Sequence, residues 1–140
     1  MNISAVLGAT IGLHALLGIG WLGVSLHAAF AQNPPIAVWT RKAQGVLAAL
    51  VFFFGLVLWR FLHAGFGPRE SILLGGVGCA ICAAGLQHGM GRASDRKLRA
   101  LPAGDSAGRA ALARRVRLAE TIAAVLLAIA LALMLVWRQA

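Results

Sequence analysis

The chain has 140 residues, of which 60% belong to the hydrophobic set and only 12% are charged. This composition excludes a disordered chain and an ordinary soluble domain, because a water-soluble fold of this size has too little interior to enclose so much apolar surface. The formal net charge of +9 would suggest nucleic acid as a partner if the basic residues gathered on a soluble surface.

Four apolar runs follow one another along the chain, at about 3–31, 43–66, 71–91 and 118–137, and they predict helices over about 3–31, 41–66, 70–92 and 110–138. Each reaches the roughly 20 residues that an α-helix needs to cross the hydrocarbon core of a bilayer. We therefore predict an all-α fold, with residues 1–140 forming a single transmembrane domain. Its architecture is an integral membrane four-helix bundle, and its first partner is the lipid bilayer.

The first run ends in Ala29-Phe30-Ala31, which resembles a signal-peptidase site. No Lys or Arg precedes the run, and it is longer than the roughly 7 to 15 apolar residues of a signal peptide, so we expect it to remain as a helix. Asn33-Pro34-Pro35 predicts the turn that follows, because proline cannot continue a helix. Gly8 and Gly12 predict a face for close packing against another helix, in this chain or in a second copy.

Two further connections separate the remaining runs. Gly65, Gly67 and Pro68 predict a turn after the second run. A longer connection is expected over about 93–110, although its last residues, from 107, are also compatible with a helix that extends the fourth run.

The basic residues lie outside the apolar runs or at their ends, and they are unevenly shared between the two sides. The positive-inside rule then places both basic loops in the cytoplasm and both the N-terminus and the C-terminus outside, as in a multi-pass protein of a bacterial-type inner membrane. This topology explains the net charge, so no nucleic-acid partner is expected. One side holds ten basic residues, Arg41, Lys42, Arg92, Arg96, Lys97, Arg99, Arg109, Arg114, Arg115 and Arg117, and the other holds three, Arg60, Arg69 and Arg138.

Four histidines, His14, His27, His63 and His88, lie within the runs or near their ends, where ionisable side chains are costly and mark function. Counted at ~1.5 Å per residue, His14 and His63 lie toward the outer side, whereas His27 and His88 lie toward the cytoplasm. Imidazole is a ligand of both haem iron and copper, so each pair is a candidate metal site. The alternative is that each ring binds a backbone carbonyl or reaches toward the headgroups.

Cys79 and Cys82 are spaced C-x-x-C and lie on one face of the third predicted helix. Thiolates are soft ligands that suit Cu(I). The pair nevertheless lies in a continuous apolar helix, without a βαβ pattern and without a second cysteine pair, so we favour a packing role.

Glu120 is the only acidic residue well inside an apolar run, and its charge needs a partner. Arg117 and Arg41 are both candidates for a structural ion pair. In the functional alternative, Glu120 accepts a proton or supports His27 or His88.

Several motifs resemble one membrane protein superfamily. His14 followed by Trp21-Leu22-Gly23 resembles the first helix of the copper-resistance protein D (CopD) family and of the related HemJ-type protoporphyrinogen oxidases. Arg41 before a helix that carries Gly55-Leu56 is similar to their second helix. The stretch from Arg114 to Glu120 resembles the Arg-rich entry and acid of their last helix, and Gln87-His88 lies where the HemJ type carries a histidine.

The resemblance implies copper movement across the inner membrane for the CopD branch, and haem b binding with protoporphyrinogen oxidation for the HemJ branch. The lysine that both branches tend to carry in the third helix is missing, because residues 71–90 contain neither Lys nor Arg. We therefore expect a CopD-like inner-membrane protein whose intramembrane histidines bind a redox-active metal, as haem b in electron transfer or as copper in handling or transport. The alternatives are a HemJ-type protoporphyrinogen IX oxidase and a non-catalytic structural subunit of a larger membrane complex, and a homo-oligomer is compatible with each.

Each candidate residue also has an expected role. His14 is the expected metal ligand, with His63 as its partner, and His27 with His88 forms the second site if there is one. Trp21 is expected to line the pocket of His14. Glu120 is expected to serve proton exchange, or to act with nearby arginines toward the propionates if the metal is in haem.

Overall fold

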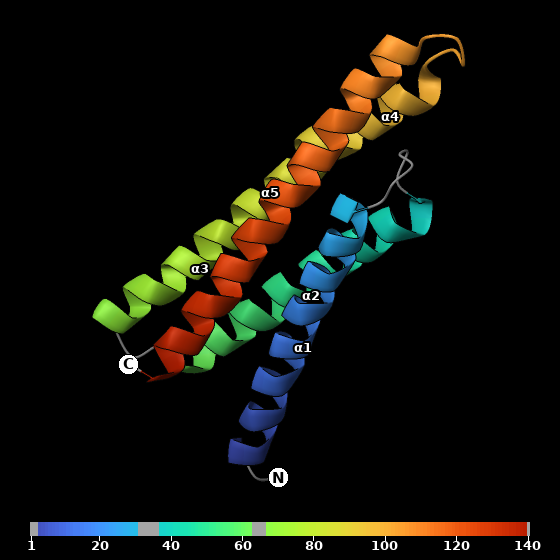
Figure 1. Ribbon diagram of the computed structural model, residues 1–140. Helices are drawn as coiled ribbons and strands as arrows, with labels where there is room; N and C mark the ends of the chain where they lie inside the picture. The colour runs from blue at the N-terminus through green and yellow to red at the C-terminus, as the bar shows by residue number, and fades with distance from the viewer. Residues whose placement is uncertain (1–2, 31–36, 63–66, 140) are drawn as a thin grey trace.

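The computed structural model describes residues 3–30, 37–62 and 67–139 of the chain. In these ranges the fold is helical apart from short turns and contains no strand, which confirms the predicted all-α class. The elements are α1 (Ile3–Phe30), α2 (Val38–Leu62), α3 (Pro68–Gly85), the π-helical stretch η1 (Leu86–Gly91), α4 (Arg92–Ala100) and α5 (Ser106–Gln139). Since α3, η1 and α4 follow one another without a break, they form one long rod (Figure 1).

All four resulting rods are long and apolar enough to cross a membrane, over Ser4–Phe30, Val38–Leu62, Glu70–Ala100 and Ser106–Trp137. Large apolar side chains such as Leu16 and Leu56 are exposed on their outer faces. In water such a surface would promote association, whereas in a bilayer it faces the lipid. The prediction of four membrane-length helices is confirmed.

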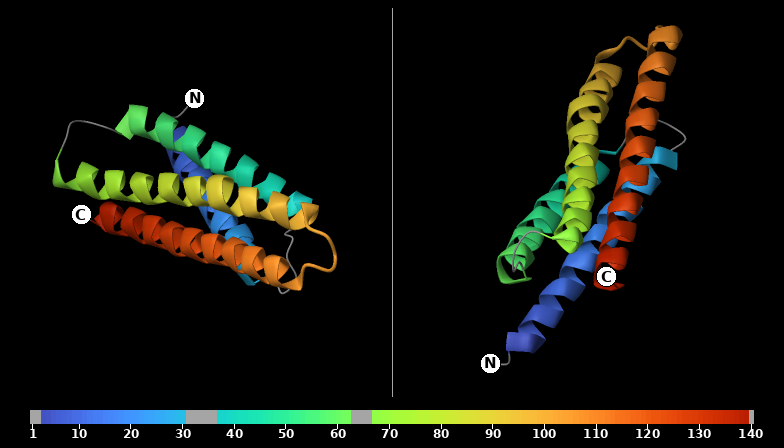
Figure 2. Two further views of the ribbon diagram at one scale, coloured as in Figure 1. Left: turned by 90° about the horizontal axis from the view of Figure 1, so that it is seen from above. Right: turned by 90° about the vertical axis from the view of Figure 1, so that its left-hand side faces the viewer.

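Helix α5 is the centre of the arrangement, because it packs against α1, α3, η1 and α4, while α1 also packs against α2. Figure 2 shows the rod of α3, η1 and α4 running alongside α5, with α1 crossing them obliquely. The interfaces consist largely of alanine, and Ala83, Ala119 and Ala123 are completely buried. Small side chains let helix backbones approach closely, which is how helices associate when lipid offers no hydrophobic drive.

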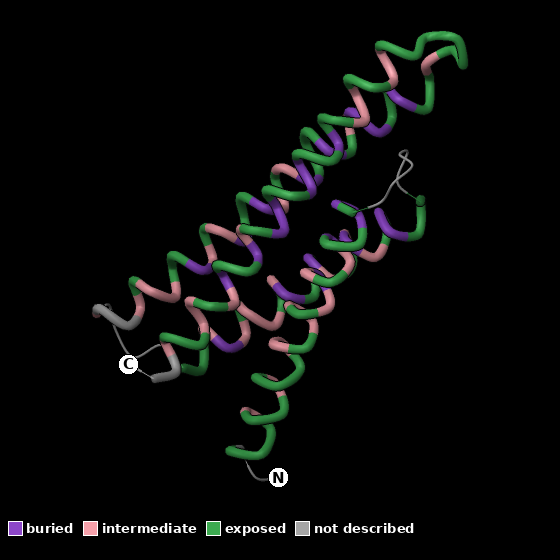
Figure 3. Tube along the Cα trace, in the orientation of Figure 1, coloured by how far each residue is buried: buried purple, intermediate pink, exposed green. Residues whose placement is uncertain are grey.

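Burial along α1 is confined to its second half, as Figure 3 shows. Trp21 and Ser25 are completely buried there, and the ring of Trp21 meets the edge of Phe52 from α2 with centroids 6.1 Å apart. The first half of α1 is largely exposed, and the space that a Cβ atom would occupy at Gly8 and at Gly12 is open. Among the described residues, this predicted packing face therefore has no neighbour.

Of the connection predicted over 93–110, only 101–105 is non-helical, so the prediction was wrong for 93–100, whereas the extension of the last helix through the residues from 107 agrees with the structure. Helix α4 continues to residue 100 because its Leu98 is buried against α5, and the apolar run alone did not reveal this amphipathic extension. Helix α5 begins at residue 106, where the carboxylate of Asp105 accepts a hydrogen bond from the backbone N–H of Gly108 at 2.9 Å and caps the helix. The resulting α4–α5 hairpin extends beyond the ends of α1 and α2 (Figures 1 and 2).

Candidate functional site

Six polar side chains meet between the helices, near the end of the bundle where α1 ends and α2 begins. All six are buried, and each of the four rods contributes at least one of them. We call this group the polar cluster: Trp21 and Ser25 from α1, Arg41 and Gln44 from α2, Gln87 from η1, and Glu120 from α5.

Glu120 is the centre of the polar cluster. Its carboxylate pairs with Nη1 of Arg41 and accepts hydrogen bonds from Nε2 of Gln44 at 2.6 Å and from Nε2 of Gln87 at 3.2 Å. A completely buried carboxylate needs both an opposite charge and further hydrogen bonds, and it has both here. Of the two ion-pair partners considered from the sequence, the structure shows Arg41, whereas Arg117 is exposed.

The remaining hydrogen bonds of the polar cluster fix the orientation of its two glutamines. The indole Nε1 of Trp21 donates to Oε1 of Gln87 at 2.9 Å, and Nε2 of Gln87 also donates to Oγ of Ser25 at 2.7 Å. Oε1 of Gln44 accepts from Nη1 of Arg41 at 3.2 Å. The network thus links residues from every spanning helix.

A glycine lets η1 approach the ion pair. A Cβ atom at Gly91 would lie 3.2 Å from Oε1 of Glu120 and 3.4 Å from Nη1 of Arg41. Any side chain at this position would therefore push against the pair. The π-helical form of η1 is itself unusual, since such wide turns are rare and are found mostly at functional sites.

His14 lies at a different level of the bundle, where its ring faces α2. A Cβ atom at Gly55 would lie only 3.2 Å from Cε1 of the ring, so glycine makes room for the imidazole. The Nδ1 atom of the ring is buried and has no hydrogen-bond partner. A neutral imidazole carries a lone pair on one of its ring nitrogens, and this is the form that binds metals.

A small cavity of about 20 Å³ lies beside His14 and is lined by Trp21 and Met134 among other residues. Its volume accommodates one water-sized species. It therefore has room for a single ion and not for a porphyrin. Trp21 connects this cavity to the polar cluster, because its ring lines the cavity and its N–H donates to Gln87.

The other predicted histidines have different neighbours. His27 is exposed, and its ring centroid lies 5.8 Å from that of Trp39 on α2. His88 is also exposed, and its Nδ1 lies 3.0 Å from the carbonyl oxygen of Ala84. His63 lies outside the described residues. Across 3–30, 37–62 and 67–139, no three His, Cys, Asp or Glu side chains gather into a metal-binding group.

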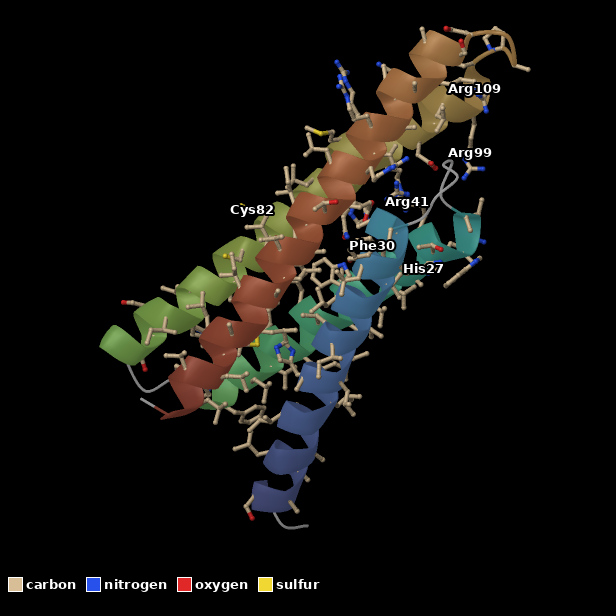
Figure 4. The ribbon with its side chains drawn as sticks, viewed as in Figure 1. His27, Phe30, Arg41, Cys82, Arg99 and Arg109 are labelled. Carbon is tan, nitrogen blue, oxygen red and sulfur yellow. The ribbon has the colours of Figure 1, made fainter. Side chains whose placement is uncertain are left out.

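Cys79 and Cys82 are free thiols, and neither belongs to the polar cluster or to the lining of the His14 cavity. Cys82 is exposed and lies on the outer face of α3 (Figure 4).

Arg41, in contrast, points between the helices (Figure 4).

Sequence reasoning missed Gln44, Gln87 and Ser25 as cluster members, and Met134 as a residue of the His14 cavity. For the two glutamines a signal was present, because neutral polar side chains within apolar runs commonly form hydrogen bonds between membrane helices. Met134 gave no such signal, since a methionine in an apolar run is usually a packing residue.

No protein-family model, curated protein or solved structure matches this chain. The resemblance to the CopD and HemJ proteins therefore depends on the quoted motifs alone.

Proposed function

We propose that this chain is a CopD-like inner-membrane protein that binds monovalent copper in the cavity beside His14. The observation that supports the proposal is the buried Nδ1 of His14, which has no partner and belongs to a residue that lines the same cavity as Met134. The positive-inside arrangement is part of the proposal, with both basic loops cytoplasmic and both termini outside.

The chemistry of the two side chains favours copper in its monovalent state. A thioether is a soft ligand that selects Cu(I), and imidazole also suits copper. Both ligands are neutral, and no acidic side chain lines the cavity. A monovalent ion is therefore favoured over a divalent one, because the cost of burying a charge in a low-dielectric interior rises with its magnitude.

Two neutral ligands also suit transfer of the ion better than permanent storage. An ion that crosses a membrane must bind strongly enough to enter and weakly enough to leave. When bound, copper would supply one-electron redox chemistry or would itself be the cargo. The apolar residues that line the cavity would exclude water from the ion. Gly55, which lies against the imidazole ring of His14, would help to hold that ring in place.

The test is anaerobic loading of the purified protein with Cu(I), followed by removal of excess metal and measurement of the copper content and affinity. We expect one copper ion per chain. His14→Ala and Met134→Leu should each weaken binding by about tenfold or more, the effect of losing one ligand or its support. Matched controls are His27→Ala and Met90→Leu, because both of these residues are exposed.

Two results would contradict the proposal. One is full copper retention by both His14→Ala and Met134→Leu. The other is loss of copper in a Cys79→Ser/Cys82→Ser double variant, which would show that thiols hold the metal instead.

A haem function remains the second candidate, and one observation favours it at His88. Its Nδ1 bonds to the carbonyl of Ala84, so Nε2 keeps the lone pair, and this nitrogen would lie 3.8 Å from a Cβ at Gly45 on α2. A reducible b-type spectrum that His88→Ala abolishes and His14→Ala retains would support this candidate. Protoporphyrinogen oxidation by membranes carrying the protein would then point to the HemJ-type enzyme, and protein with neither copper nor haem to a structural subunit.

A further inference from the structure

Three hydrogen-bond donors beside the polar cluster have no acceptor. They are Nε and Nη2 of Arg41 and Oγ1 of Thr40, and all three atoms are buried. The two residues are adjacent on α2, and Arg41 is 7% exposed and Thr40 1%. Buried donors without a partner are rare because each loses its bonds to water without compensation.

The free atoms of Arg41 form one edge of its guanidinium group. Nη1 is occupied by Glu120 and Gln44, whereas Nε–H and the neighbouring N–H of Nη2 are parallel donors on the other side. This edge matches two oxygens of a phosphate or carboxylate, which arginine binds in a bidentate manner. The free edge therefore selects an oxyanion over a halide or a single carbonyl.

The position of these donors in α2 adds two further features that favour an anion. Thr40 and Arg41 belong to the first turn of this 25-residue helix, where the helix dipole is positive and the first backbone N–H groups lack intrahelical partners. The N–H of Arg41 itself donates to the carbonyl oxygen of Ala37 at 3.3 Å, so its contribution to an anion site comes from the side chain. Gly91, whose Cβ position would be 3.6 Å from Nη2, carries no side chain that could serve as an acceptor.

The first turn of α2 and the residue after it also carry side chains of the types found at a membrane surface. Trp39 is 60% exposed and Lys42 is also exposed, and indole rings and basic side chains are typical of the headgroup level. Arg41 lies two residues from Trp39, which corresponds to about 3 Å along the helix axis. The first turn of α2 thus carries the residue types of the headgroup level, where lipid phosphates are found.

We propose that Arg41 and Thr40, with the first turn of α2, bind a phosphate oxyanion, supplied by a phospholipid headgroup or by free phosphate. The site is separate from the His14 cavity and does not depend on copper binding. The phosphate oxygens would accept hydrogen bonds from the free donors of Arg41 and Thr40.

The test measures the unfolding temperature of the purified protein in a sugar-based detergent during three titrations. The first uses dioleoyl phosphatidylglycerol, the second uses dioleoylglycerol, which has the same acyl chains and no phosphate, and the third uses inorganic phosphate. We expect a saturable rise with the phospholipid and none with dioleoylglycerol. A similar rise with inorganic phosphate alone would identify the free ion as a sufficient ligand.

Variants distinguish phosphate binding at this site from nonspecific attraction of phosphate by the basic residues of the α4–α5 hairpin. Arg41→Lys keeps a positive charge for Glu120 but removes the forked edge, and Thr40→Val removes only the hydroxyl. Each should weaken the apparent affinity about tenfold, as expected for loss of one charge-assisted hydrogen bond. Thr10→Val is the matched control, because the hydroxyl of Thr10 bonds within the exposed half of α1.

The proposal would be overturned if neither phosphate source gave a saturable rise, since the donors would then be satisfied by water. It would also be overturned if Thr40→Val and Arg41→Lys responded like the wild type while Arg114→Gln/Arg115→Gln lost the response. If Arg41→Lys does not fold, Thr40→Val alone decides between these outcomes.

Discussion

The polar cluster and the His14 cavity are neighbouring regions that share Trp21, but they differ in whether their central ionisable group has hydrogen-bond partners. In the polar cluster, the Glu120 carboxylate has three donors from three other side chains. In the cavity, apolar walls surround a histidine nitrogen that has no partner. The comparison indicates that the fully bonded Glu120 carboxylate fixes how the helices pack, whereas the unpartnered Nδ1 of His14, like the free edge of Arg41, is available for a ligand.

The largest expected effect comes from removing the carboxylate at the centre of the polar cluster. Glu120→Ala leaves Arg41 charged and buried without its counter-ion, and should lower the free energy of unfolding by about 3–5 kcal/mol. Denaturant unfolding in detergent measures the change, with Glu70→Gln in the first turn of α3 as the control. A loss no greater than that of the control would mean that the cluster does not hold the bundle together.

Replacing the shared residue tests whether the two regions depend on each other. Trp21→Phe removes the indole N–H, leaves Oε1 of Gln87 unsatisfied and enlarges the cavity, so it should cost about 2–3 kcal/mol. We also expect weaker Cu(I) binding, measured by the same loading assay as for His14→Ala. Unchanged stability together with lost copper binding would show that Trp21 serves only the cavity.

Two glycines of η1 provide a matched pair of substitutions. Gly91→Ala places a methyl group against Glu120 and Arg41 and should destabilise the protein by about 1–2 kcal/mol, as overpacking does. Gly89→Ala enters open space and should be neutral or slightly stabilising, because alanine favours helix over glycine. Equal unfolding temperatures for the two variants would contradict the close packing of η1 on the ion pair.

The smallest effect is expected from the cysteines of α3. Cys79→Ser and Cys82→Ser alter side chains that take no part in either region, so stability and copper content should change little. Both are measured on the protein used for the preceding variants. A clear loss of copper would move the metal site from His14 to the thiols.

The helices were predictable from the sequence because span length and apolar composition alone determine them. The ends of the last two rods were not predictable in the same way. The amphipathic helix α4 buries Leu98, but its sequence is too polar to count as part of an apolar run. The pairing of Glu120 with Arg41 was one of two possibilities, and only the rotation and crossing of the helices decide between them.

The candidate site was less predictable than the fold. Its histidines were visible as ionisable residues, but the neighbours of each ring depend on helix rotations that residue spacing does not determine. Gln44 and Gln87 were recognisable as polar residues within apolar runs, although their common acceptor was not. Met134 reaches the His14 cavity from the last helix, and nothing in its local sequence distinguishes it from the surrounding leucines and alanines.

The π-helical turn at η1 has a consequence for how this rod tolerates insertions and deletions. The buried positions Ala83, Gln87 and Gly91 are spaced four residues apart across this turn. A π turn holds about one residue more than an α turn for nearly the same rotation, so deleting a single residue within η1 would restore a regular α-helix and leave the two parts of the rod in register. A one-residue deletion should therefore be tolerated within η1, whereas the same deletion within α3 would rotate the rest of the rod by about 100° and misalign it with α5.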